Sequence, residues 1–227
     1  MKKNTYVQFE NSFFEKIIRK KRMEMLDLLK REINISKIKN LLDIGTTDDT
    51  ALRSSNIFCH MLNKIPTHKS ISNQKIKDKR FKLCLNKSIT SNFNKKQINV
   101  MKSDLVVSSA TIEHVGNLAS QIQKVKNMIS LSRKYIVITT PNRFFPIEVH
   151  TKLPLIHWLP KKTFRKVLLW LGMTYFAKEK NLNLLDRLEL SQILNMFSKD
   201  MNYKIYNIYF LGFVSNFLVI CKMKKND

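Results

Sequence analysis

The residues able to do chemistry gather where two apolar runs of the sequence stop. One run ends in Asp43 and Gly45, and the other, residues 103–115, ends in Glu113 and His114. If both runs are strands of an open α/β sheet, these residues lie at the carboxyl ends of the strands, where such sheets bind ligands. Carboxylates accept charge-assisted hydrogen bonds, and histidine can exchange a proton near neutral pH. The pattern favours a ligand-binding enzyme domain over a structural or scaffold protein.

Each of these residues also has a purely structural interpretation. Asp43 can cap the turn after its strand, with Gly45 only forming that turn. Glu113 can be an anion favoured by the dipole at the start of the next helix, and His114 can be a structural ring. As functional groups, Asp43 would accept a hydrogen bond from a bound ligand, and His114 would be a base or a substrate contact. The sequence leaves both interpretations open.

A second group of polar side chains lies in the long segment 142–199. Glu148, His150 and His157 are its candidates, because a carboxylate beside a histidine can orient and polarise the ring as a base for a hydroxyl group. They can equally be polar residues of a covering loop. His150 and Glu148 offer two metal ligands without a clear third, so we predict no metal site.

The hydrophobic pattern predicts the elements that position these groups. We predict a helix from Ser12 to about Ile33, which opens with a capping box and covers an edge or the mouth of a sheet. Strands and helices then alternate, which implies a parallel sheet. The expected strands are residues 40–45, 69–72, 81–85, 104–108 and 135–140, with helices from 48–51 to about 62 and over 117–131, and a closing antiparallel hairpin of 203–210 and 213–222.

These elements predict a Rossmann-like α/β fold. We expect a doubly wound, mostly parallel seven-stranded sheet with an antiparallel C-terminal hairpin. Residues 1–38 would form an N-terminal helical cap, and residues 39–227 the main domain, with residues 142–199 as an insert.

The charge of the chain is +24, from 41 Lys and Arg against 17 Asp and Glu. Such a surface attracts phosphate backbones and anionic lipid heads alike. The cations are spread along the chain, as an AT-rich genome would also produce. Residues 19–22 form a basic cluster on the expected solvated face of the first helix, with nucleic-acid contact as the alternative. Residues 158–171 form a basic amphipathic stretch, which predicts a helix packed on the core or one lying on an anionic membrane.

The three cysteines, Cys59, Cys84 and Cys221, are odd in number and widely separated. This argues against a disulfide framework or a zinc site and for a reducing compartment. Residues 208–221 are apolar but shorter than the roughly 20 residues of a membrane span. We therefore expect a cytoplasmic protein, with a peripheral membrane position as an alternative.

Taken together, the motifs resemble those of class I S-adenosylmethionine-dependent methyltransferases over residues 40–222. Asp43-Ile-Gly45 falls where that family has Asp-x-Gly-x-Gly, residues 104–115 resemble its fourth-strand motif with a Glu-His pair, and residues 139–143 resemble the end of its fifth strand. Residues 145–151 and 153–160 (Phe-Pro-Ile-Glu-Val-His-Thr and Leu-Pro-Leu-Ile-His-Trp-Leu-Pro) are similar to a subgroup of small bacterial methyltransferases, some associated with cell-surface polysaccharide genes.

The resemblance implies S-adenosylmethionine as cofactor and the Rossmann-like sheet described above. It implies cofactor contacts at Asp43, Gly45, Thr46, Thr47, Ser72, Asn73, Asn86, Ser88, Ser108 and Ser109. Where the family has acidic residues near the ribose and the adenine, this chain has neutral ones, which lose the charge-assisted part of the contact. His114, His150 and Glu148 are the candidate catalytic residues.

The function that follows is methyl transfer from S-adenosylmethionine to a small or lipid-linked acceptor, with a glycan hydroxyl as one candidate. The +24 charge motivates an RNA methyltransferase as an alternative. The missing ribose carboxylate motivates a second alternative, a non-catalytic methyltransferase-like binding module.

Overall fold

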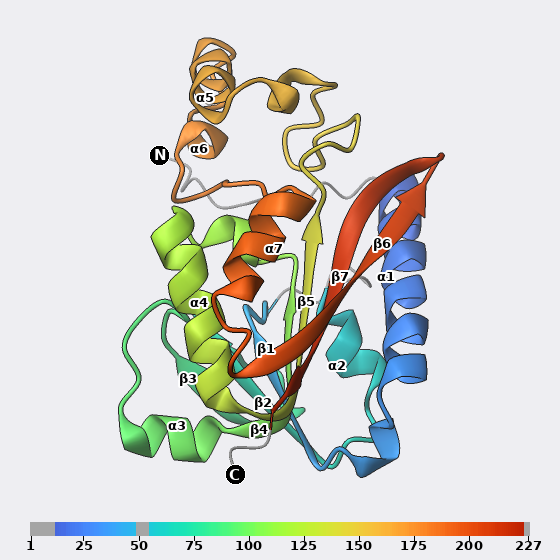
Figure 1. Cartoon of the computed structure of the whole chain (residues 1–227), viewed down its shortest axis with the longest axis vertical. Helices are drawn as coiled ribbons and strands as arrows, with labels where there is room; N and C mark the ends of the chain where they lie inside the picture. Colours follow the sequence, from blue (N-terminus) through green and yellow to red (C-terminus); the bar gives the residue numbers. More distant parts are fainter. Residues whose placement is uncertain (1–11, 49–54, 225–227) are drawn as a thin grey trace.

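Seven strands form one mixed sheet in the computed structural model, which describes residues 12–48 and 55–224. The strand order is β3-β2-β1-β4-β5-β7-β6 (Figure 1). Strands β1 to β5 run parallel, β7 is antiparallel to β5, and β6 and β7 form the closing hairpin. This arrangement confirms the predicted fold class. The bounds are β1 Asn40–Ile44, β2 Thr67–Ser72, β3 Phe81–Asn86, β4 Ser103–Ser109, β5 Ser132–Pro141, β6 Met201–Phe210 and β7 Phe213–Met223.

Helices cover both faces of the sheet, as Figure 1 shows. One face carries α1 (Ser12–Glu32) and α2 (Ile57–Met61), and the other carries α3 (Lys95–Met101), α4 (Leu118–Leu131) and α7 (Arg187–Asn195). Strand β4 shows why its sequence is continuously apolar. Leu105 and Val107 belong to the hydrophobic cluster beneath α1 and α2, whereas Val106 belongs to the cluster beneath α4 and α7. A central parallel strand buries both faces because its side chains alternate.

The N-terminal helix α1 packs its apolar stripe onto the sheet. Met25, Leu26 and Leu29 are buried in the cluster on that face, and Glu32 pairs with Lys204 of β6 at 3.0 Å. Within the basic cluster 19–22, Arg19 and Lys20 are exposed. No helix among residues 12–48 and 55–224 is long and apolar enough to cross a membrane.

Two helices differ from the expectation. Helix α3 was not predicted, although Asn94 and Gln97 form a reciprocal capping box at its start, which is a recognisable signal. The helix expected from residues 48–51 to about 62 is shorter in the structure, where α2 begins at Ile57. Residues 49–54 of that prediction lie outside the described residues.

Residues 142–185 rise from the end of β5 and return to the sheet at the same place. An isolated bridge joins Asn142 to Leu185 at the base, and a second one joins Ile147 to Pro154. Between them lie three short helices, η3 (Ile156–Trp158), α5 (Lys161–Trp170) and α6 (Thr174–Ala177). In Figure 1, α5 and α6 stand beyond the end of the sheet, around a small apolar cluster of their own. Helix α7, which follows, packs instead into the main core.

Candidate active site at the carboxyl ends of the strands

The loop after β1 is built around Gly45. Its backbone has φ of +85°, and a Cβ atom there would lie 2.5 Å from Cγ2 of Thr111, which follows β4. The Gly45 amide donates to Ile71 O of β2 at 2.9 Å. A side chain is therefore excluded twice, by the left-handed backbone and by the close approach of Thr111. The turn after β1 therefore requires glycine because it packs against the residues that follow β4.

Asp43 lies beneath this loop and is almost inaccessible, with 5% of its surface exposed. Its Oδ2 accepts a hydrogen bond from Thr46 Oγ1 at 2.7 Å. Burial raises the pKa of Asp43 to about 6, against the opposing effects of the Thr46 hydrogen bond and the positive charge of Lys124. The carboxylate is mostly ionised at neutral pH but poorly solvated, so a cationic ligand at this site would find a strong partner.

The ends of β2 and β3 carry the residues expected near a ribose and an adenine. The hydroxyl group of Ser72 is already engaged, since it donates to Thr46 O at 2.6 Å and accepts from the Gln74 amide at 3.1 Å. The Asn86 amide, in the orientation that satisfies its neighbours, donates to Ser72 O and Asn73 O. These side chains tie the β1 and β2 loops together, and they contribute no carboxylate.

Asn73 is exposed beside this loop, and the Ser88 hydroxyl hydrogen-bonds to Thr90 at 2.8 Å. Thr47 exchanges two hydrogen bonds with Asn56, through its amide and its carbonyl. A pocket of about 320 Å³ opens beside β2 and β3, at the lower end of the range for small-molecule sites. It is lined by Ser70, Gln74, Lys75, Ile76, Cys84, Leu85 and Asn86.

A chain of hydroxyl groups connects the end of β4 to a buried lysine. Ser108 Oγ hydrogen-bonds to Thr111 Oγ1, and Lys124 Nζ donates to the same Thr111 oxygen. Ser109 Oγ forms a hydrogen bond of 3.1 Å with Thr139 Oγ1 of β5. Burial lowers the pKa of Lys124 to about 7, although the charges of Glu113 and Asp43 raise it. The two predicted serines thus lie at the strand end, but each contacts a protein partner.

Sequence analysis missed Lys124 and Thr111. Lys124 lies on the buried face of α4 together with Gln121 and Met128, at the helical spacing of the apolar stripe. A lysine in such a position must find a polar partner within the core, and this spacing is the signal that could have identified it. Thr111 carries no comparable signal, because its contact with Gly45 joins residues distant in the sequence.

Glu113 is fully buried and lies ahead of helix α4, outside its first turn. It lies in the short 3-10 helix η2 (Ile112–His114), whereas α4 starts at Leu118 with Asn117 as its N-cap. The structural interpretation of Glu113 as an anion at a helix start is therefore wrong. Thr140 donates to Glu113 Oε2 at 3.1 Å, and Oε1 has no hydrogen-bond partner among the described residues.

The insert brings His150 against His114. Their Nε2 atoms lie 3.1 Å apart, and the rings meet edge to face with centroids 4.7 Å apart. His150 Nδ1 donates to Glu148 Oε1 at 2.6 Å, while His114 Nδ1 donates to the Asn181 carbonyl at 2.7 Å. All three predicted catalytic residues therefore gather at one point, above the end of β4.

Electrostatics hold Glu148 ionised in this cluster. Burial raises the pKa of Glu148, but the charge and hydrogen bonds of His150 and the Thr151 amide outweigh burial and lower the pKa to about 2. Burial lowers the pKa of His150, but the Glu148 carboxylate reverses this and the net pKa is raised. For His114, burial prevails over the attraction of Glu113 and the pKa is lowered. Two neighbouring rings thus differ in proton affinity.

Asn183, in the segment by which the insert returns to the sheet, is hydrogen-bonded to the loop after β4 and to α4. Its amide donates to Glu113 O at 2.7 Å, and its side chain donates to Gly116 O at 3.0 Å. Gln121 of α4 donates to Asn183 O at 2.9 Å. The histidine pair is therefore held from both sides, by the loop after β4 and by the returning segment of the insert.

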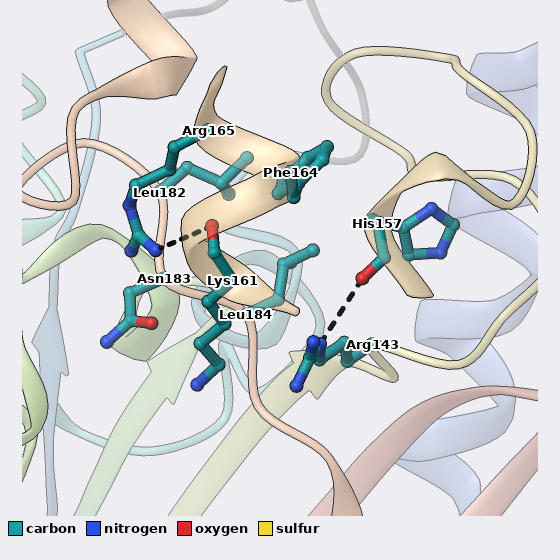
Figure 2. A pocket seen from close by; sticks show the side chains of 8 residues that line it. All are labelled: Arg143, His157, Lys161, Phe164, Arg165, Leu182, Asn183 and Leu184. Atoms are coloured by element: carbon teal, nitrogen blue, oxygen red, sulfur yellow. Dashed lines mark hydrogen bonds between the residues drawn. The ribbon is translucent and has the colours of Figure 1, made fainter. Parts of the chain in front are cut away.

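His157 lies apart from this cluster. Its Nε2 donates to Phe145 O at 2.7 Å, and it lines a small hollow with Arg143, Lys161 and Arg165 (Figure 2). Arg143 donates to the carbonyls of His157 and Leu159. The hollow is about 10 Å³, room for about one water molecule. The hollow is too small for a substrate, and the hydrogen bonds of Arg143 around it hold the insert together.

No model of a known protein family matches this sequence, and no curated protein matches it significantly. Solved structures do match. The N-methyltransferase NodS of Bradyrhizobium japonicum, in complex with S-adenosyl-L-homocysteine, is 11% identical, with a TM-score of 0.54 over 90% of this chain and 87% of that one. The magnesium protoporphyrin IX methyltransferase of Synechocystis, with the same ligand bound, is 10% identical, with a TM-score of 0.55 over 96% and 90% of the two chains.

The plantazolicin methyltransferase BpumL, also in complex with this ligand, is 14% identical, with a TM-score of 0.55 over 95% of this chain and 86% of that one. At such low identity these similarities establish the fold and nothing finer. The chain has the fold of S-adenosylmethionine-dependent methyltransferases, with their sheet and its antiparallel closing hairpin.

Proposed function

We propose that this protein is an S-adenosylmethionine-dependent methyltransferase that acts on an oxygen acceptor. The observation that carries the proposal is the Gly45 loop. It is a left-handed turn packed so closely against Thr111 that no Cβ fits, and it lies next to a buried carboxylate at the ligand-binding end of a methyltransferase fold. Asp43 also caps this turn through Thr46, but a neutral side chain could do so without burying a charge, so the carboxylate favours a cationic ligand.

The residues present fit the cofactor at its amino-acid end. Asp43 would accept from the ammonium group, and the bare backbone at Gly45 would allow close approach of the methionine portion. Thr46 and Thr47 complete this loop. The adenosine end would rest on the pocket beside β2 and β3, where Asn86 and Gln74 offer neutral amide groups. When bound, the cofactor supplies an electrophilic methyl group, which passes to the acceptor oxygen as its bond to sulfur breaks.

The acceptor would be activated by the histidine pair. His150, oriented and made more basic by Glu148, lies with His114 at the end of β4. That is beside Ser108 and Ser109, whose side chains are small. A hydroxyl group must lose its proton to be methylated, so a basic group at this position has a clear task.

Calorimetric titration with S-adenosyl-L-homocysteine tests the cofactor site first. We expect micromolar binding by the wild-type protein and by His150→Ala, because His150 lies outside the cofactor loop. Absence of binding up to millimolar ligand by folded protein would refute the proposal and favour the non-catalytic binding module. Turnover by His150→Ala that equals the wild-type rate would refute only the role of His150.

We further propose that the acceptor is linked to a lipid and is met at an anionic membrane surface. Trp170 is 85% exposed and Leu169 is exposed beside it, both at the end of α5. Lys162 and Lys166 of the same helix are also exposed. Exposed aromatic and basic side chains on one protruding helix suit the headgroup region of a bilayer.

Sedimentation with lipid vesicles tests this second proposal. We expect retention on vesicles that contain phosphatidylglycerol, weak retention on phosphatidylcholine alone, and loss of retention in Trp170→Ala. The matched control is Leu188→Ala on α7, which removes an apolar side chain of similar exposure outside the protruding segment. Equal binding to both kinds of vesicle, or equal loss in the control, would refute a membrane role for α5.

A further inference from the structure

Three groups that can ligate a metal ion converge where the insert meets β4. Glu113, His114 and His150 each offer a ligand atom, and these atoms all lie within 4.8 Å of one another. Sequence analysis counted only His150 and Glu148 and therefore expected no metal. In the structure Glu148 is hydrogen-bonded to the Nδ1 atom of His150 and is not one of the three groups. The two further ligands, Glu113 and His114, come from the loop after β4.

The hydrogen bonds fix which ring nitrogens carry protons. A carbonyl oxygen can only accept, so His114 Nδ1 must hold the proton that it donates to Asn181 O. Both Glu148 oxygens already accept from backbone amides, of His150 and of Thr151, and Oε1 lies 2.6 Å from His150 Nδ1, so this nitrogen is the donor and holds a proton. In the neutral rings, both Nε2 atoms then present lone pairs to each other across 3.1 Å. Two lone pairs so close require something positive between them.

A shared proton would satisfy the two rings but not Glu113. Its Oε1 is buried and has no hydrogen-bond partner among the described residues. A buried carboxylate oxygen left in that state is costly. A cation bound to all three side chains would satisfy both nitrogens and this oxygen together.

We propose that Glu113, His114 and His150 bind a divalent first-row transition-metal ion. Two imidazoles and one carboxylate on one side of an ion, with positions left open, are an established donor set for such metals. With metal–nitrogen bonds of about 2.1 Å, the 3.1 Å separation of the Nε2 atoms gives an angle of about 95° at the ion. This is close to the right angle between neighbouring ligands of an octahedron.

The surroundings of the two rings match those of metal-bound histidines. Such rings usually donate their other N–H to a carboxylate or a backbone carbonyl, which fixes the tautomer and raises the basicity of the ligand. Here Glu148 does this for His150, and the Asn181 carbonyl does it for His114. The cluster is thus oriented with its ligand atoms inward.

The inference rests on the proposed function and deepens it. A cation here would bind the acceptor hydroxyl group at an open position and lower its pKa. With the ion bound, the histidine pair would activate the acceptor as ligands of the metal, in place of the direct proton acceptance proposed for the metal-free site. The hydroxyl proton would leave to water, and no electron would be transferred. Activation of the acceptor would then depend on the metal.

Titration of the metal-free 227-residue protein with Co²⁺ tests the site, because bound Co²⁺ gives visible absorption bands that report its coordination. We expect one ion per chain, weak bands typical of six-coordination, and micromolar affinity. Glu113→Gln keeps the size of the side chain and the acceptor for Thr140, and it should weaken binding at least tenfold. Glu148→Gln should weaken binding about 10-fold to 100-fold through its effect on His150.

The matched control is His60→Ala, which removes an exposed histidine on α2 outside the cluster. It should bind Co²⁺ like the wild-type protein. Wild-type binding no tighter than that of Glu113→Gln, or an equal loss in His60→Ala, would overturn the proposal. Binding of S-adenosyl-L-homocysteine, measured on the same metal-free sample, reports separately on the methyltransferase function. Cofactor binding without Co²⁺ binding would refute only the metal site, and Co²⁺ binding without cofactor binding would refute only the methyltransferase.

Discussion

Replacing Asp43 by asparagine should make the protein more stable and abolish its function. Because the pKa of Asp43 rises from 3.8 to about 6, and one pKa unit corresponds to about 1.4 kcal/mol, the ionised carboxylate costs the folded state about 3 kcal/mol. Asparagine keeps an oxygen for Thr46 but has no charge to desolvate. Its own amide must still be buried, so we expect a gain of about 1–3 kcal/mol at pH 8.

The difference in stability between Asp43→Asn and the wild-type protein should depend on pH. Below pH 3.8 the carboxyl group is protonated in both the folded and the unfolded state, and Asp43→Asn should match the wild-type protein. Between pH 3.8 and about 6 the folded state holds a proton that the unfolded state has lost, so wild-type stability declines as pH rises. The advantage of the variant should therefore grow over this window and become constant above it.

Urea unfolding from pH 3.5 to 8 measures this difference, with Asp200→Asn, an exposed carboxylate, as the control. At pH 8 Lys124 is mostly neutral, because its pKa is about 7, so loss of its neighbour's charge adds little. The same variant should bind S-adenosyl-L-homocysteine at least tenfold more weakly. An Asp43→Asn protein less stable than wild type at pH 8, or a difference that does not vary with pH, would refute the reasoning.

Three further outcomes follow from the site. Gly45→Ala should lose cofactor binding and about 2 kcal/mol or more of stability. The control Gly212→Ala, with a similar φ of +80° and nothing near its Cβ position, should lose only about 1–2 kcal/mol through backbone strain. Equal losses of the two variants in calorimetry and urea unfolding would contradict the Thr111 contact. His150→Ala should lower kcat by about 100-fold with cofactor affinity unchanged, as single-turnover kinetics with an identified acceptor would show. Retention on RNA should be weak and should not fall steeply with salt, and a steep salt dependence in filter binding would instead favour the RNA methyltransferase.

The fold could be predicted because its signals are local. The runs that became β1, β4 and β5 are apolar and bounded by turn residues, β4 and β5 also contain β-branched residues, and the Gly212 hairpin is equally plain in the sequence. Local signals also placed Asp43 and Gly45 at the end of β1, where the structure has them.

The contacts within the site could not be predicted, because they join distant elements. His114 and His150 were expected near one crevice, but that their Nε2 atoms face each other depends on the path of the insert. The same holds for Lys124, which reaches Thr111 from α4. Ser72 was expected to contact a ribose, yet its hydroxyl group joins the loops after β1 and β2. Whether it does so depends on how closely those two loops approach, which the sequence does not show.

The two bridges divide the insert into an inner turn and an outer segment. The inner bridge, Ile147 to Pro154, encloses Glu148 and His150, and the outer bridge, Asn142 to Leu185, closes the base around the whole segment. Chain added between Pro154 and Leu185 would enlarge a loop whose ends are already held, and doubling such a loop costs only about 0.6 kcal/mol. The α5–α6 segment can therefore be replaced, lengthened or changed in charge, while the turn that carries His150 stays in place.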